Sequence, residues 1–120
     1  MATYYKLDAN RVAHPCTLEE WHSCYNPAGR DGKGAWTRVA EDKIGPYWVS
    51  TVFLGLDHQF VDGGPPLIFE TMAFDQSESR WDVGEELEQL RCSTWEEAVA
   101  QHKWTVQMMR NRLEAMGRKK

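Results

Sequence analysis

WVSTVFLGL (48–56), DHQFVDGGPP (57–66) and LIFETMAF (67–74) form one continuous stretch that holds the densest apolar residues of the chain. Short apolar runs rich in β-branched and aromatic residues, bounded by turn residues, are typical of β-strands. We therefore expect two paired strands joined by a loop longer than a hairpin turn requires. Long loops often carry function, so residues 57–66 are the first place to look for it.

Both faces of the first run are largely apolar, which places this strand in the middle of a sheet or between layers. The faces carry Trp48, Val52, Leu54 and Leu56 on one side, and Val49, Thr51 and Phe53 on the other. The second run alternates between Leu67, Phe69, Thr71 and Ala73 on one side, and Ile68, Glu70, Met72 and Phe74 on the other. Glu70 stands out because a buried carboxylate needs a partner.

The residues before this stretch predict four short elements. They are a strand at 3–7, an extended segment at 12–15, a short helix from Leu18 to before Asn26, and an edge strand at 36–44 in which Trp36, Arg38 and Ala40 share a face. The helix begins at a capping box formed by Thr17 and Glu20, and its apolar stripe is Leu18, Trp21 and either Cys24 or Tyr25. Residues 26–34 predict a surface loop.

The residues after this stretch predict a loop at 75–86, a strand or a helical turn at 87–92, and a long helix. Ser93 or Thr94 caps the helix, with Glu96 and Glu97 at the matching third positions. Its apolar stripe is Trp95, Val99, His102, Val106, Met109, Leu113 and Met116. A helix of about 22 residues is about 33 Å long, so we expect its last turns to overhang the sheet.

These elements predict one α+β domain over residues 1–120. It is an antiparallel meander of three to five strands with a short N-terminal helix, and the long C-terminal helix packs on one face. The net charge of −4 argues against a duplex nucleic-acid binder, although five basic residues lie near the C-terminus (Arg110, Arg112, Arg118, Lys119 and Lys120). A cytoplasmic protein is expected, because there is no signal peptide or membrane span and the three cysteines form an odd set.

Three quoted stretches carry a family resemblance: VSTVFLGLDHQF (49–60), GPPLIFETMAF (64–74) and STWEEAVAQH (93–102). In this order they resemble a group of small uncharacterised proteins encoded in bacteriophage and prophage genomes. YYKLD and PCTLEEW near the N-terminus match more weakly, while GRDGKGAW and residues 76–86 depart from the pattern. The resemblance covers about half of the chain. It implies a phage or prophage origin and transfers no activity.

The best candidate for chemistry is Asp57 and His58 together with Glu70 and His102. Two histidines and two carboxylates could bind a divalent metal and activate water, or form a His–carboxylate acid–base pair. The structural alternative is simpler. Asp57 caps a turn, His58 bonds within the loop, and Glu70 pairs with an arginine or accepts a hydrogen bond from His102, which lies at the edge of the core.

Two further groups of residues have both functional and structural interpretations. His14 with Cys16 and His22 with Cys24 could hold zinc, but their spacing matches no usual zinc pattern, so we expect no metal and no cofactor. Phe60 and Asp62 could form a protein-recognition tip or a rigid turn. Trp104 and Met108 lie off the main helix stripe, where they pack on the N-terminal helix or form a homodimer or partner interface.

Three functions follow from these observations. The leading hypothesis is a small, non-enzymatic interaction protein of phage or prophage origin, which binds a host or phage protein, for example to inhibit a host factor such as a defence system. The second is an enzyme that uses the cluster at 57, 58, 70 and 102. The third is an oligomeric assembly component held together through the C-terminal helix.

Overall fold

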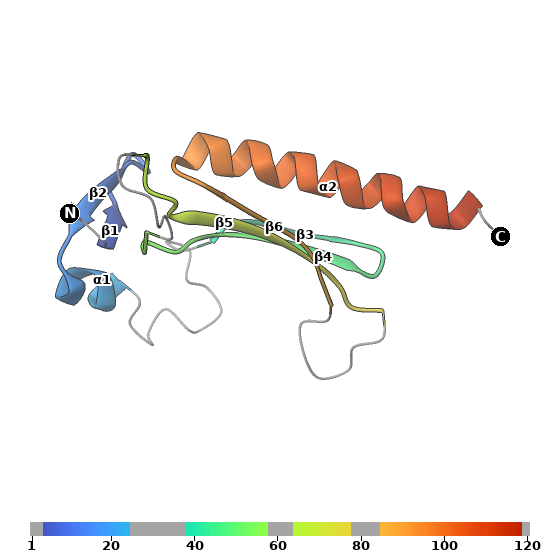
Figure 1. The fold of residues 1–120 in the computed structure, drawn as a ribbon, viewed down its shortest axis with the longest axis horizontal. Coiled ribbons are helices and arrows are strands. Elements are labelled where there is room, and N and C mark those ends of the chain that lie inside the picture. The colour runs from blue at the N-terminus through green and yellow to red at the C-terminus, as the bar shows by residue number, and fades with distance from the viewer. Residues whose placement is uncertain (1–3, 25–37, 58–63, 78–84, 119–120) are drawn as a thin grey trace.

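A computed structural model describes residues 4–24, 38–57, 64–77 and 85–118, and it confirms the α+β class. The main sheet has four antiparallel strands in the order β3-β4-β5-β6, and the helix α2 lies along one face (Figure 1). The bounds are β3 (Arg38–Ile44), β4 (Tyr47–Phe53), β5 (Phe69–Asp75), β6 (Glu85–Cys92) and α2 (Trp95–Arg118). A smaller unit holds β1 (Tyr4–Leu7), β2 (Ala13–Cys16) and α1 (Leu18–Cys24).

The strand predicted for the middle of the sheet, β4, lies between β3 and β5. Its residues Tyr47, Val49, Thr51 and Phe53 are buried, as are Phe69, Thr71 and Ala73 of β5. Residues directly opposite each other on neighbouring strands point to the same face, and Val49 pairs with Ala73. These buried residues therefore form one face, which we call the first sheet face, and α2 packs on it.

A β-bulge in β3 changes which residues share a face. Arg38 pairs with Val52, and Ala40 pairs with Thr51. Two steps along β3 thus correspond to a single step along β4. The prediction that Arg38 and Ala40 lie on one face is therefore wrong, because a bulge inserts an extra residue and reverses the alternation. Arg38 now faces the side opposite α2, while β3 remains the edge strand that the sequence predicts.

The helix α2 begins where the capping box predicts. The amide of Glu97 donates to Thr94 Oγ1 and the amide of Thr94 donates to Glu97 Oε1, both at 3.1 Å, so Thr94 is the cap. The buried stripe includes Ala98 and Thr105 beside the predicted His102, Val106 and Met109. Figure 1 shows the C-terminal end of α2 extending past the β3–β4 turn.

The N-terminal unit lies at the end of the sheet where β4 ends (Figure 1). The α1 capping box forms as predicted, with Thr17 and Glu20 bonded reciprocally at 3.1 Å. Trp21 packs on the Tyr4 ring and donates from Nε1 to the Leu54 carbonyl at 3.0 Å. Leu18 of the predicted apolar stripe is 50% exposed, whereas Trp21 of the same stripe contacts Tyr4 and Leu54.

Candidate functional site

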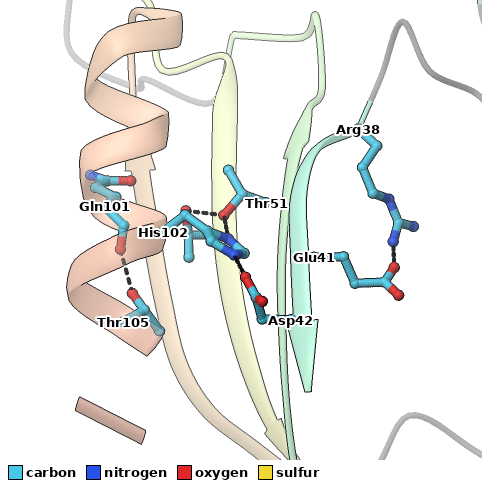
Figure 2. A network of polar contacts seen from close by, with 8 residues as sticks. Arg38, Glu41, Asp42, Thr51, Gln101, His102 and Thr105 are labelled. Atoms are coloured by element: carbon cyan, nitrogen blue, oxygen red, sulfur yellow. Dashed lines mark hydrogen bonds and ion pairs between the residues drawn. The ribbon is translucent and has the colours of Figure 1, made fainter. Parts of the chain in front are cut away.

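The imidazole of His102 lies between the helix and the sheet, where it joins three strands. Its Nε2 lies 2.8 Å from Asp42 Oδ2 on β3, and its Nδ1 lies 2.7 Å from Thr51 Oγ1 on β4 (Figure 2). Thr51 Oγ1 in turn lies 2.8 Å from Thr71 Oγ1 on β5. His102 is 4% exposed, so a single buried side chain of α2 makes polar contact with the first sheet face.

The proton arrangement follows from what each group can donate. A carboxylate only accepts, so His102 donates from Nε2 to Asp42. In the tautomer that carries its proton on Nε2, Nδ1 accepts from the hydroxyl of Thr51, and Thr51 Oγ1 then accepts from Thr71. Each of these four side chains therefore has a hydrogen-bond partner, as buried polar groups require.

The order carboxylate, imidazole and hydroxyl is also that of hydrolase triads. In a triad, however, the hydroxyl oxygen must reach a substrate carbonyl. Thr51 and Thr71 are both fully buried, so no substrate can approach either oxygen. The chain of hydrogen bonds is therefore a structural link between α2 and the sheet.

Glu70 lies on the side of the sheet opposite His102. It pairs with Val52 rather than Thr51, and its Oε2 accepts from Arg91 Nε at 3.1 Å and from Gln89 Nε2 at 2.8 Å. The structure thus gives Glu70 the arginine partner of the structural alternative. The sheet separates Glu70 from His102, so the two side chains do not converge on one catalytic centre.

Asp57 ties the two ends of the long loop together. Its Oδ1 accepts from the Leu67 amide at 3.0 Å, and the amides of Leu54 and Gly55 both donate to the Ile68 carbonyl. Asp57 thus has the turn-capping role of the structural alternative. The remaining loop candidates, His58, Phe60 and Asp62, lie outside the described residues.

The histidine–cysteine pairs form no shared centre in the described part of the chain. His14 Nε2 lies 2.7 Å from Asp8 Oδ2, Cys16 ends β2, and His22 is exposed on α1; the Cys24 side chain lies outside the described part. No group of three or more His, Cys, Asp or Glu side chains gathers in metal-binding geometry among these residues. Cys92 is buried, which raises the pKa of its thiol to about 11.

The two helix candidates differ in exposure. Trp104 is 56% exposed, whereas Met108 is half-buried and packs against the core that Tyr47, Val49 and Val106 form. Trp21 of the N-terminal helix, the packing partner in the alternative interpretation, packs on the ring of Tyr4. Trp104 therefore lies on the side of α2 that faces away from the sheet, and its indole ring is exposed to solvent.

The side of the sheet opposite α2 carries an apolar hollow of about 280 Å³. We call this side the second sheet face, and its lining residues are Arg38, Trp48, Ser50, Val52, Glu70, Met72 and Phe74. Trp48 and Phe74 stack with ring centroids 5.3 Å apart and an interplanar angle of 27°. No described helix packs on this side, since the contacts of α2 and the core clusters all involve the first sheet face.

The sequence shows that both faces of β4 are apolar, but this pattern alone does not predict a binding surface on the second sheet face. The signal was present in Trp48 and Val52, which alternate with the buried Val49 and Thr51. A long helix after the sheet covers one face only, so the apolar residues of the other face need a different explanation. No comparable pattern in the sequence indicates that Asp42 and Thr51 are the hydrogen-bond partners of His102.

Comparisons with known proteins give no relative: no family model, no curated protein and no solved structure matches this chain. Neither helix of the described segments is long and apolar enough to cross a membrane.

Proposed function

We propose that this protein is a small interaction protein that binds another protein through the second sheet face. The observation that carries the proposal is the hollow, in which Trp48, Val52 and Met72 line an opening on the solvent side of a rigid sheet. Protein interfaces are enriched in Trp, Phe and Met, and such side chains provide most of the binding energy when a partner covers them.

The family resemblance adds an origin to this proposal. A phage or prophage protein of this size would act in the cytoplasm of a bacterial host, where inhibition of a host factor such as a defence system is a role that binding alone can fulfil. The motif GPPLIFETMAF contains all of β5 except Asp75, and β5 supplies Glu70, Met72 and Phe74 to the hollow. The quoted motifs therefore include part of the proposed surface.

Site-specific photo-crosslinking in host cells tests the proposal. A photoreactive amino acid replaces Val52 or Met72, both half-buried, and replaces the exposed Lys103 of α2 as the control. We expect one protein to be crosslinked in high yield from positions 52 and 72 and not from 103. The proposal fails if neither position of the second sheet face gives a specific product.

A second candidate, the oligomeric assembly component, is favoured by the exposure of Trp104 and of Met116, which is 50% exposed on the same helix. Sedimentation of the wild type and Trp104→Glu separates it from a monomer. If α2 holds an oligomer together, the wild type sediments as a multiple of 13.9 kDa and the variant at that mass. An identical mass for both removes this helix side from any interface.

A further inference from the structure

We propose that the occupant of the second sheet face is an amphipathic α-helix of the partner protein. This inference rests on the function proposed above and specifies the chemistry of the partner. It follows from the width of the apolar stripe, the charges beside it, and the way the same sheet already binds a helix.

The apolar stripe has the dimensions of one helix. Its residues lie only on the two central strands, with Trp48 and Val52 on β4 and Met72 and Phe74 on β5. Two strands spaced about 4.8 Å apart give a stripe about 10 Å wide, which is the diameter of an α-helix. From Trp48 to Val52 the stripe is roughly 13 Å long, or about two and a half helical turns.

The edge strands border this stripe with polar and charged residues. Opposite Trp48, Ser50 and Val52, β3 supplies Lys43, Glu41 and Arg38. Opposite Phe74, Met72 and Glu70, β6 supplies Glu86, Gln89 and Arg91. The middle of this surface is apolar apart from Ser50 and Glu70, and its borders are polar or charged, a pattern that complements the apolar stripe and polar flanks of an amphipathic helix.

The first sheet face shows that this sheet binds a helix. There α2 contacts all four strands, and the apolar core beneath it includes Tyr47 and Val49 of β4, Ala73 of β5 and Ile44 of the edge strand β3. Polar edge residues contact it from the side, as Asp42 of β3 does through His102. A helix on the second sheet face would complete a three-layer arrangement, in which both faces of the sheet are covered.

The charges predict the flanks of the partner helix. On the β3 side, Arg38 and Lys43 outnumber Glu41, which pairs with Arg38. On the other side, β6 supplies Glu86 and Arg91, and Glu70 of the central strand β5 pairs with Arg91, so the net charge at this border of the stripe is negative. Complementary potentials fix the orientation of a bound helix. We therefore expect acidic residues on the flank toward β3 and basic residues on the flank toward β6.

An added β-strand fits this surface less well than a helix. Strand addition uses the backbone groups of a sheet edge, and charged residues on an edge strand oppose it. The edge strand β3 carries Glu41, Asp42 and Lys43 in succession, and β6 carries Glu85, Glu86 and Glu88. The apolar surface lies instead in the centre of the sheet, where only side chains make contact.

Two yeast-displayed peptide libraries of equal composition test this inference, each with peptides of about 18 residues, long enough to form a helix. One library places apolar residues at helical spacing, with Glu on one flank and Lys on the other, and the second places them at alternate positions. The immobilised proteins are the wild type, Met72→Lys, Met72→Gln and, as a matched surface control, Trp104→Lys. Far-UV circular dichroism confirms that each variant is folded.

We expect the wild type and Trp104→Lys to retain the helical library about tenfold better than Met72→Lys, with Met72→Gln between them. The inference is overturned if the alternating library is retained equally well, if Met72→Lys retains the helical library like the wild type, or if neither library is retained. Each of these results leaves the crosslinking test of the proposed function intact. A partner that is crosslinked at positions 52 and 72 while the helical library fails would show binding through another kind of segment.

Discussion

The two ring nitrogens of His102 hold α2 against β3 and β4, so loss of this side chain removes two hydrogen bonds and leaves a cavity. We expect His102→Ala to lower the free energy of unfolding by about 3 kcal/mol, which combines the cavity with the loss of the imidazole partner of the buried Thr51 hydroxyl. Urea denaturation measures the change. His22→Ala, an exposed histidine on α1, is the matched control and should alter stability by less than about 0.5 kcal/mol. Equal effects of the two substitutions would contradict the structural link.

Asp8 gives the protein a predictable response to acid. Its carboxylate accepts from the Val12 and Asn10 amides and lies beside His14, and these contacts lower its pKa, the bond from Val12 most and that from His14 next. A carboxyl whose folded pKa lies below its unfolded value stabilises the fold above the unfolded pKa, and this stability is lost as the pH falls through the folded pKa. We expect urea midpoints to decrease below about pH 4, and to decrease less for Asp8→Asn. An identical acid profile for the variant would exclude this contribution.

At the scale of the element, the start of α2 depends on one hydroxyl. Thr94 Oγ1 accepts from the Glu97 amide, one of the helix amides that has no partner within the helix. Thr94→Ala should therefore reduce stability by about 1 kcal/mol in urea denaturation. Ser93→Ala is the control, because the amide of Glu97 bonds to Thr94 and not to Ser93. A larger loss for Ser93→Ala would place the cap one residue earlier.

The caps could be predicted from the sequence because their partners lie three residues apart, as Thr17 and Glu20 or Thr94 and Glu97 do. The two central strands were predictable for a similar reason, since their alternation is local. The bulge that separates Arg38 from Ala40 was not, because it depends on how β3 pairs with β4. A strict alternation therefore assigned Arg38 to the wrong face and gave no indication that it lines the hollow.

The environment of His102 shows where prediction from the sequence ends. Its place on the helix stripe was visible at a spacing of three to four residues, but Asp42 is 60 positions away and Thr51 is 51 away. Which polar groups meet across a helix–sheet interface is set by the crossing of the two elements. The second sheet face could not be predicted for the same reason, because the position of α2 decides which face of the sheet remains uncovered.

The whole molecule is elongated, with a radius of gyration of 15.9 Å and extents of 53 × 33 × 25 Å. A compact chain of this length has a radius of gyration of roughly 14 Å. The difference arises because β1, β2 and α1 lie at one end of the sheet and not on its open side (Figure 1). We expect small-angle X-ray scattering of the monomer to give a value near 15.9 Å. A value of roughly 14 Å would mean that the N-terminal unit packs over the second sheet face.

The closure at the base of the long loop has a practical consequence for engineering. Asp57 binds the Leu67 amide, and Ile68 accepts from Leu54 and Gly55, so the two chain ends are held together by residues outside positions 58–66. Lengthening a loop whose ends are already fixed costs little conformational entropy. An epitope tag or a fluorescent peptide inserted after position 60 should therefore leave the sheet folded. The same insertion should destabilise the protein more when it is made in the Asp57→Ala variant. Positions 58–66 thus provide a site for attaching a reporter while both faces of the sheet keep their native sequence.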